Sequence, residues 1–464
     1  MENVIENDSQ KNNSWCSKNF TSWIMVGCCV ILMLLWPVIH TIALRIALLL
    51  TGGIIGFAYT IRERSSLYQK PALPLFFIFL FFIWLGIHYF LYSHNPQLEL
   101  GQIKGTWLRV LLACFLGIGS GLFVRHHPRA QLVIWTGILS FFLISYIDYA
   151  WVSFTNNDWG IPYKFWLGFF NNKTTAVFYG IVSIALACGV VSHQLTQATK
   201  INGHILAAMM ACMGFTFLVF VITGTKNGVA LSLILVISVL FSFLRRSNKS
   251  FISISIASAF IVAICLMTFL HLKLAPQWNN FFPSVEAGLQ IHKYPNWKGH
   301  LYYGILKPED GTLVDESAYL RTAWFVAGVE LLLKNPLGYG LYDQSFRYLA
   351  LADDTLGLPS ESLLIATHSG WLDFSLGLGI PGLLLTWTAI ALAIFYSFKQ
   401  ISIWSFNTRW VLTGTFIVWI FAEICNNHFI ETLFYLIALF SAGNLPIIEK
   451  FPHSSTGEYD KSSS

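Results

Sequence analysis

The chain is organised around the polar segment 279–368, whose centre reads Ser317-Ala-Tyr-Leu-Arg-Thr-Ala-Trp-Phe-Val-Ala-Gly-Val-Glu-Leu-Leu-Leu-Lys-Asn-Pro-Leu-Gly-Tyr-Gly340. It is the one long stretch that fits neither a membrane helix nor a short connecting loop. It ends at Thr367-His368-Ser-Gly-Trp-Leu-Asp-Phe374, where the next apolar run begins. We expect this segment to hold an arginine and a histidine over the mouth of a helical membrane body.

Composition decides the class of protein. Charged residues make up 11% of the chain, against about 25% in soluble domains. Hydrophobic residues make up 55%, and the mean hydropathy is +0.61. Repeated apolar runs of about 20 residues predict an all-α polytopic membrane protein. The eight cysteines form no disulfide or metal-binding pattern, and the net charge of +5 comes from short loops, so it does not indicate nucleic-acid binding.

Twelve candidate membrane spans can be marked: 22–38, 41–60, 72–92, 106–124, 131–153, 174–192, 203–222, 226–244, 251–271, 369–396, 408–424 and 427–446. Basic residues alternate between the loops, with eleven on one side and four (Lys104, Lys164, Lys173 and Lys226) in the short loops of the other. The positive-inside rule therefore predicts cytoplasmic termini and an external large loop.

These spans divide the chain into five parts. We expect a cytoplasmic N-terminal segment at 1–21, transmembrane helices 1–9 at 22–271, a large periplasmic loop containing helices at 272–368, helices 10–12 at 369–446, and a disordered cytoplasmic tail at 447–464. The large loop 272–368 is called the insert below.

Within the insert, residues 318–333 predict a helix. Asp315 or Ser317 can cap its start, and Lys334-Asn335-Pro336 predicts its end. Helical spacing places Arg321, Phe325, Gly328 and Leu332 on one face, with Trp324 at its edge. Since Gly328 has no side chain, another backbone or a ligand can approach closely there. Arg321 is expected in the first turn, where a guanidinium and exposed N–H groups form an anion site, unless its side chain extends to the lipid headgroups.

The aromatic residues of the insert allow two interpretations. They lie in the membrane interface, which is the favoured reading, or they stack on sugar rings. The residues concerned are Trp278, Phe281, Phe282, Tyr294, Trp297, Tyr302 and Tyr303.

A second pattern also points to an anion site. The spans predicted to run inward begin with cationic or ionisable groups, namely Arg45, Arg109, Lys173, Lys226 and His368. Helix N-termini and cations on one face attract anions. The alternative is that these residues extend to the headgroups or pair with Asp148, Glu423 or Glu431.

His368 allows two interpretations. A histidine at the edge of a span is commonly an interfacial hydrogen-bonding group. A helix N-terminus, however, disfavours imidazolium, and a neutral imidazole can accept a proton from a hydroxyl group. Outside the cytoplasm there is no ATP or nucleotide-sugar, so group transfer there needs a lipid-linked activated donor. The pyrophosphate of such a donor suits the cations above.

Three motifs resemble one family. Gly224-Thr-Lys-Asn-Gly228 opens a span, Arg321 lies in a helix followed by Asn-Pro-Leu-Gly-Tyr-Gly340, and His368 precedes Leu376-Gly-Leu-Gly-Ile-Pro-Gly382. Together they resemble the O-antigen ligase/polymerase superfamily, and O-antigen ligases of Gram-negative inner membranes in particular. The resemblance is specific over about 220–385.

The resemblance implies a GT-C-like glycosyltransferase that needs neither metal nor cofactor. Such an enzyme transfers O-antigen from undecaprenyl pyrophosphate, the donor, to lipid A–core oligosaccharide, the acceptor. His368 matches the base of the family, while Arg321 and Lys226 match its pyrophosphate-binding residues. Family members usually carry arginine at the Lys226 position, and lysine keeps the charge but loses the bidentate geometry. Arg109, or Lys104, matches a further basic residue of the ligases.

The implied mechanism is direct attack with inversion at the anomeric carbon, with fixed cations stabilising the leaving pyrophosphate. An O-antigen polymerase and a protein O-oligosaccharyltransferase of the same superfamily are the nearest alternatives. A membrane transporter or lipid flippase is the alternative from another class, for which broken helices and charges at the membrane midplane are expected.

Overall fold

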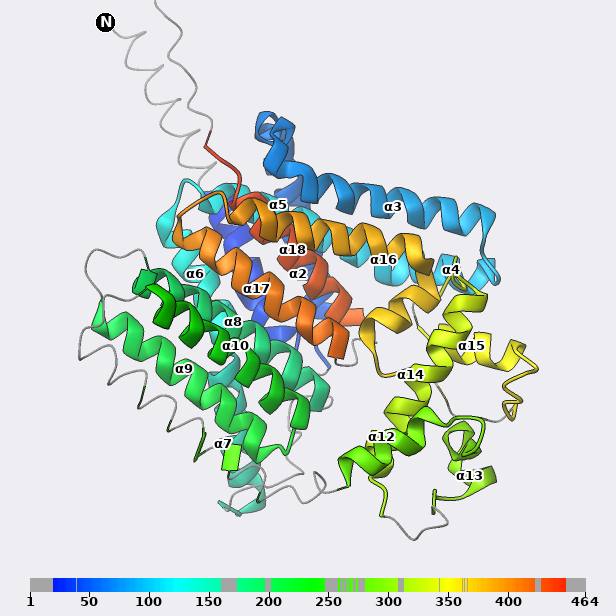
Figure 1. The fold of residues 1–464 in the computed structure, drawn as a ribbon. Coiled ribbons are helices and arrows are strands. Elements are labelled where there is room, and N and C mark those ends of the chain that lie inside the picture. Colours follow the sequence, from blue (N-terminus) through cyan, green and yellow to red (C-terminus); the bar gives the residue numbers. More distant parts are fainter. Residues whose placement is uncertain are drawn as a thin grey trace, which may run out of the picture.

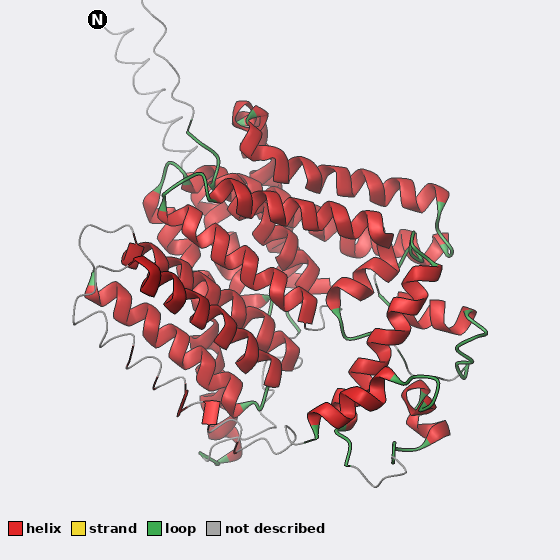
Figure 2. Cartoon of the chain, viewed as in Figure 1, coloured by secondary structure: helices red, strands yellow, loops and turns green. Residues whose placement is uncertain are grey.

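The computed structural model describes residues 20–38, 40–159, 173–196, 202–246, 280–307, 313–341, 343–360, 362, 364, 366–421 and 427–447, with isolated positions between 258 and 273. Across these residues the regular structure is helical and includes no β-strand (Figure 2). The all-α prediction is therefore confirmed for this part of the chain. The predicted segments 1–21 and 447–464 lie almost wholly outside it.

The helices follow one another along the chain as labelled in Figure 1. A helix at Phe20–Leu35 comes first. After it come α2 (Ile42–Arg62), η1 (Arg64–Tyr68), η2 (Lys70–Ala72), α3 (Leu73–Leu91), α4 (Pro96–Gln102), the π-helical turn η3 (Ile103–Trp107), α5 (Leu108–Val124), α6 (Pro128–Leu139), α7 (Phe141–Asn156), α8 (Lys173–Thr196), α9 (Gly203–Ile222), α10 (Lys226–Arg246), α12 (Phe281–Leu289), η5 (Pro295–Lys298), α13 (His300–Tyr303), α14 (Glu316–Lys334), α15 (Ser345–Ala352), α16 (Gly370–Ser397), α17 (Ile403–Phe421) and α18 (Asn427–Gly443).

The structure does not show twelve membrane spans. Six described helices are long and apolar enough to cross a membrane, or up to seven if the bent pair α6 and α7 is one span. The predicted spans overlap described helices, with 131–153 covering the bent pair α6 and α7, while most of 251–271 lies outside the described residues. Three of these helices are shorter apolar segments, and α17 carries Asn407, Thr408 and Arg409 near its start. The chain is nevertheless a multi-pass helical membrane protein.

The surface of α3 is that of a lipid-facing helix. Its exposed large side chains, Phe76, Phe79, Ile83, Ile87 and Phe90, recur every three or four residues along one face. Phe90 is 80% exposed and Phe79 is 59% exposed. An apolar stripe of this kind is stable against hydrocarbon and not against water.

The described residues form two hydrophobic cores. The larger core joins the membrane helices, here called the body, with α18 packed against α5. The smaller core belongs to α12–α15, here called the lobe, which lies at one end of the body (Figure 1). Trp297, Tyr319 and Phe346 are fully buried in the lobe. The interface or sugar-stacking interpretation of Trp297 is therefore wrong, because its indole fills the core and donates to the Ile291 carbonyl at 3.1 Å.

The lobe is joined to the body through a break in α16. Gly379 has φ +73° and ψ 172°, outside the helical region. The turn 336–340, which follows α14, binds the backbone groups that this break exposes. The amides of Tyr339 and Gly340 donate to the carbonyls of Leu376 and Gly377, both at 2.8 Å, and the Ile380 amide donates to the Pro336 carbonyl at 2.8 Å. These bonds fix the first half of α16 to the end of α14.

A buried histidine of the body holds the same turn. His88 Nε2 donates to the Leu337 carbonyl at 3.0 Å, since a carbonyl only accepts. His88 Nδ1 faces Glu99 Oε1 at 3.1 Å, and both side chains are fully buried. Gly340 lies directly against the Glu99 carboxylate with φ +102°.

Replacing Gly340 with alanine is expected to destabilise the protein. The new Cβ would meet the Glu99 carboxylate, and the positive φ would be strained. We expect a loss of about 1–3 kcal/mol, measured as a lower thermal unfolding temperature in detergent. Gly86→Ala is the control, since Gly86 lies in α3 and, its chain neighbours and the adjacent backbone of its own helix apart, no heavy atom lies within 4 Å of its Cβ position. Equal unfolding temperatures for the two variants would contradict this account of the turn.

Candidate functional site

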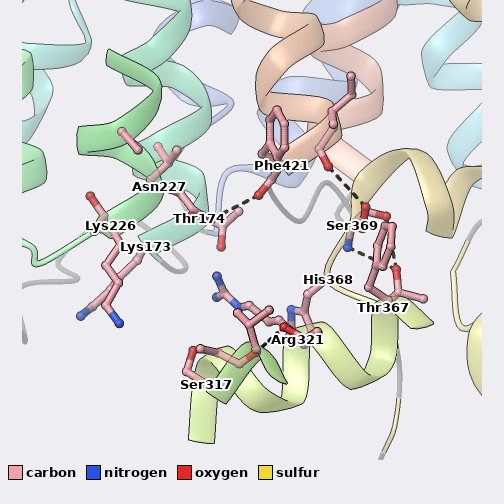
Figure 3. Close-up of a pocket in the computed structure, with 18 of the residues that line it drawn as sticks. Lys173, Thr174, Lys226, Asn227, Ser317, Arg321, Thr367, His368, Ser369 and Phe421 are labelled. Carbon is pink, nitrogen blue, oxygen red and sulfur yellow. Dashed lines mark hydrogen bonds between the residues drawn. The ribbon is translucent and has the colours of Figure 1, made fainter. Parts of the chain in front are cut away.

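A cavity of about 880 Å³ lies between the lobe and the body. Lys226 at the start of α10, Arg321 in α14 and His368 in the loop before α16 all line it, as Figure 3 shows. These three residues, predicted from the sequence, come from segments far apart in the chain. The structure thus brings them to one place.

Helix α14 supplies the floor of the cavity. It spans Glu316–Lys334, and the Asp315 side chain caps it by accepting from the Ser317 amide. The predicted helix, its Asp315 cap and its end are therefore confirmed. Because the helix begins two residues earlier than expected, Arg321 lies in the second turn and not the first. Arg321 and Phe325, one turn apart, face the cavity.

Gly328 explains how the histidine loop reaches α14. A Cβ at Gly328 would lie 2.7 Å from Thr367 Cγ2 and 2.8 Å from Leu372 Cδ2. Only a residue without a side chain leaves room for this contact. A close approach therefore occurs at Gly328, but it is made by the side chains of Thr367, beside His368, and of Leu372 in α16, and not by the backbone or ligand that the sequence predicted.

His368 is held in an unusual backbone conformation. Its φ is +57°, in the left-handed region that residues other than glycine seldom adopt. The imidazole stacks on Trp324 of α14, with ring centroids 4.8 Å apart and planes 24° apart. Trp324 is itself fixed, since its Nε1 donates to the Trp297 carbonyl at 3.1 Å. Such strain persists where surrounding contacts impose it, and it is common at active sites.

Hydrogen bonds on both sides of His368 impose this conformation. The Thr367 amide donates to Asp373 Oδ1 at 2.7 Å, and Asp373 is buried in the first turn of α16. The Ser369 amide donates to Thr367 Oγ1 at 3.2 Å. The Ser369 hydroxyl donates to the Ile420 carbonyl at the end of α17, at 3.3 Å. The loop is thereby tied to two helices of the body.

The opposite wall of the cavity is formed by two helix starts. Lys173 is the first residue of α8 and Lys226 the first residue of α10, and both line the cavity (Figure 3). The Lys226 ammonium pairs with Asp315 Oδ2 at 2.6 Å. Positive helix ends add to the charge of the two lysines.

The cavity is cationic overall. Its described lining carries three full positive charges (Lys173, Lys226 and Arg321) and one negative charge (Asp315), which gives +2 (3 − 1) without His368. Arg321 makes no hydrogen bond or ion pair with any residue that the structure describes. A guanidinium on the lining of a cavity can bind an anionic ligand through charge-assisted hydrogen bonds.

The remainder of the lining is apolar and aromatic. Phe325 lies edge-on to Trp371 with ring centroids 6.2 Å apart, and Trp371 lies 6.0 Å from Trp387. An amphipathic cavity of this kind suits a ligand with a charged head and an apolar or sugar-containing remainder.

The structure does not bring Arg109 to the lining of this cavity. Its Nε lies 3.0 Å from Glu431 Oε1, whose other oxygen accepts from Trp36 Nε1 at 3.1 Å. Pairing with Glu431 is the alternative that the sequence analysis left open for these cations. Lys104, the other match for this position, is exposed in η3.

Three participants were missing from the set of predicted site residues. Lys173 was identified as a cation at the start of a predicted span, but not as one of the pyrophosphate-binding residues. Asp315 was identified only as a helix cap, and Trp324 only as the edge of a helical face. No sequence pattern predicts that Asp315 pairs with Lys226 or that Trp324 stacks on His368. Among the described residues, no group of three or more His, Cys, Asp or Glu side chains could hold a metal ion.

The fold and the site define a class: a multi-pass helical membrane protein with an amphipathic, cationic cavity beside a histidine. The comparisons make this more specific. The sequence model of the O-antigen ligase family matches residues 208–387, from α9 to α16. Lys226, Arg321 and His368 lie inside the match, and Arg109 lies outside it. The family comprises enzymes that transfer lipid-linked glycans, ligases and polymerases among them. A search of curated proteins found no match.

Removing the Arg321 charge is expected to weaken anion binding. Arg321→Gln should weaken the binding of inorganic pyrophosphate to the detergent-solubilised protein about tenfold or more, since a charge-assisted contact is lost. Isothermal titration calorimetry measures this directly. Arg64→Gln is the control, because Arg64 is exposed in η1 and does not line the cavity. Unchanged affinity in Arg321→Gln would remove this arginine from the anion site.

Proposed function

We propose that this protein is a glycosyltransferase that transfers O-antigen polysaccharide from undecaprenyl pyrophosphate to lipid A–core oligosaccharide. One observation carries the proposal: His368, Arg321 and Lys226 line a single cavity. The match of residues 208–387 to the O-antigen ligase family supports it. The proposed architecture is GT-C-like.

In the proposed reaction, His368 removes the proton from an acceptor hydroxyl. The oxygen then forms a bond to the anomeric carbon of the donor glycan, on the face opposite the leaving group. The bond between that carbon and the pyrophosphate oxygen breaks, and its electron pair leaves with undecaprenyl pyrophosphate. The anomeric centre is inverted. His368 passes the proton to water before the next turnover.

The cations act on the leaving group. Arg321 and Lys226 would contact the pyrophosphate and stabilise the charge that builds on it as the bond breaks. Because a pyrophosphate is stable as an anion, it leaves without protonation. Arg109 remains a predicted third contact of the pyrophosphate. To contact the pyrophosphate, Arg109 would have to break its ion pair with Glu431.

The stacking of His368 on Trp324 supports its role as the base. The contact orients the imidazole over α14, on which Arg321 lies three residues before Trp324. The strained loop holds the ring at a fixed place relative to the guanidinium. Fixed orientation of a base beside its substrate is a large part of catalysis by positioning.

The proposal includes a membrane arrangement. The insert 272–368 faces the periplasm, both termini face the cytoplasm, and the protein lies in a Gram-negative inner membrane with membrane lipids as neighbours. The distribution of basic residues between loops supports this orientation. The aromatic wall at Trp371 and Trp387 suits the lipid-linked donor, which would enter from the bilayer.

Loss of His368 is expected to stop transfer but not donor binding. His368→Ala should lower the transfer rate about 10²- to 10⁴-fold, the usual contribution of a general base. Pyrophosphate affinity should stay within about twofold, because the cations remain. Radiolabelled glycan transfer in membranes measures the rate. The control is His292→Ala, since His292 is exposed and pairs with Glu330 at 3.5 Å. A normal transfer rate in His368→Ala would exclude the proposed base.

The molecule that accepts the glycan distinguishes a ligase from a polymerase and from a protein O-oligosaccharyltransferase. Labelled lipid-linked O-antigen supplied with lipid A–core should yield labelled lipopolysaccharide. Supplied with a second donor molecule, it should give no longer glycan, and supplied with pilin, it should give no glycoprotein. Glycan elongation would identify a polymerase, and labelled pilin would identify a protein O-oligosaccharyltransferase. Substrate flux across proteoliposomes without glycan transfer would identify a transporter.

A further inference from the structure

The imidazole of His368 lies nearly parallel to the indole of Trp324. The two ring centroids are 4.8 Å apart, and the ring planes differ by 24°. The nitrogens of an imidazole donate and accept hydrogen bonds in the plane of the ring. A parallel stack therefore directs them sideways and not into α14, and it restricts rotation about χ2, a torsion that is otherwise broad. The contact thus fixes the direction in which His368 can accept a proton.

Trp324 lies behind the histidine as seen from the cavity. The described lining includes His368 and, on α14, both Arg321 and Phe325, but it does not include Trp324. The Trp324 side chain is partly buried. A ligand in the cavity therefore contacts the imidazole and not the indole, so an effect of Trp324 on the reaction is transmitted through His368.

The core of the lobe fixes the indole. Trp324 Nε1 donates to the Trp297 carbonyl at 3.1 Å. Trp297 is 1% exposed, and its amide donates to the Tyr319 hydroxyl at 3.1 Å. That hydroxyl donates in turn to the Tyr294 carbonyl at 2.7 Å. Because these bonds connect Trp324 to buried residues, its ring presents a fixed surface to His368.

The proposed reaction turns His368 into a cation inside a cationic cavity. The acceptor proton moves from the hydroxyl oxygen to a ring nitrogen, while the O–H electron pair goes to the new bond with the anomeric carbon. The described lining already carries three positive charges and one negative charge, on Lys173, Lys226, Arg321 and Asp315. One further carboxylate, Asp373 of α16, accepts from the Thr367 amide in the same loop. Neighbouring positive charges oppose the formation of another cation.

An aromatic face attracts a cation, and indole does so more strongly than the other aromatic side chains. We propose that Trp324 is a positioning residue of the transfer reaction. Its indole orients the imidazole of His368 and stabilises the imidazolium that forms as the acceptor hydroxyl loses its proton. An interaction that strengthens as charge develops lowers the barrier without strengthening substrate binding. This inference rests on the proposed function, because it assumes that His368 is the base.

Two substitutions of Trp324 test this role. The assay supplies the full-length protein in membranes with saturating radiolabelled lipid-linked O-antigen and lipid A–core. Trp324→Leu removes the aromatic face and should lower kcat about tenfold or more. Trp324→Phe keeps a smaller ring with a weaker attraction for cations and should lower kcat only about threefold. The donor KM and the affinity for inorganic pyrophosphate should stay within about twofold, since neither variant changes the described lining of the cavity.

A matched control perturbs the same part of the lobe and leaves the stack intact. Tyr319→Phe removes the hydroxyl that is bonded to the Trp297 amide and the Tyr294 carbonyl. It should lower the thermal unfolding temperature, because two buried backbone groups lose a partner, while kcat stays within about twofold. A merely structural role of Trp324 would instead make the loss of kcat follow the loss of stability in all three variants.

A double variant tests whether Trp324 acts through His368. In the His368→Ala background the imidazole is gone, so Trp324→Leu or Trp324→Phe should lower the residual rate no further. A further fall in that background would show that the indole acts on the reaction in some other way.

Several other results would overturn the inference. These are a wild-type kcat in Trp324→Leu, an equal kcat in Trp324→Leu and Trp324→Phe, or a loss of pyrophosphate affinity that accounts for the whole effect. If Trp324→Leu does not fold, Trp324→Phe decides the question, since a wild-type kcat in that variant contradicts the role. A wild-type protein that transfers no glycan would refute the proposed function as well. Transfer that needs His368 but not Trp324 would refute this inference alone.

Discussion

The site depends on the contact between α14 and the loop that precedes α16. At Gly328 the helix has no side chain, and Thr367 and Leu372 fill that space. The same contact places His368 on Trp324, so the imidazole lies over the helix that carries Arg321. A Cβ at 328 would overlap the side chains of Thr367 and Leu372, so a larger residue would require these side chains to shift. One missing side chain thus allows the histidine and the arginine to share a cavity.

The loop can hold a strained histidine because its neighbours are bonded on every side. Asp373 accepts from the Thr367 amide, and Ser369 donates to the end of α17. Further along, the turn 336–340 bonds across the break at Gly379 and is held in turn by His88. The energy of these bonds offsets the cost of a left-handed backbone at His368. The lobe therefore contacts the body at two connected places, the loop that carries His368 and the turn 336–340. The cavity lies beside these contacts.

The sequence predicted the local features of the site well. Helical spacing placed Arg321 and Gly328 on one face of α14, and the capping pattern identified Asp315. These features depend on residues close together in the chain, for which periodicity and capping preferences are sufficient. The proximity of Lys226, Arg321 and His368 was inferred from the placement of cations at the starts of the predicted spans and from the family resemblance. The structure places all three residues in one cavity.

What the sequence did not predict depends on long-range contacts. Asp315 reaches Lys226 across 89 residues, and no pattern in either segment indicates the other. Arg109 faces Glu431 and not the cavity, although its position in a helix resembles that of the cavity cations. Trp297 fills the core of the lobe, because burial depends on tertiary packing. The twelve predicted spans are not shown, since only six or seven described helices meet the length and composition criterion for crossing a membrane, and several apolar runs form shorter helices.

The central claim is that one cavity holds both the base and the pyrophosphate-binding cations. A cryo-electron microscopy structure of the protein with undecaprenyl pyrophosphate bound tests it most directly. The account predicts density for the pyrophosphate between Arg321 and Lys226, with His368 facing the space beyond the phosphates. Pyrophosphate density away from this cavity, or bound beside Arg109 and Arg45 with Arg321 unoccupied, would contradict it.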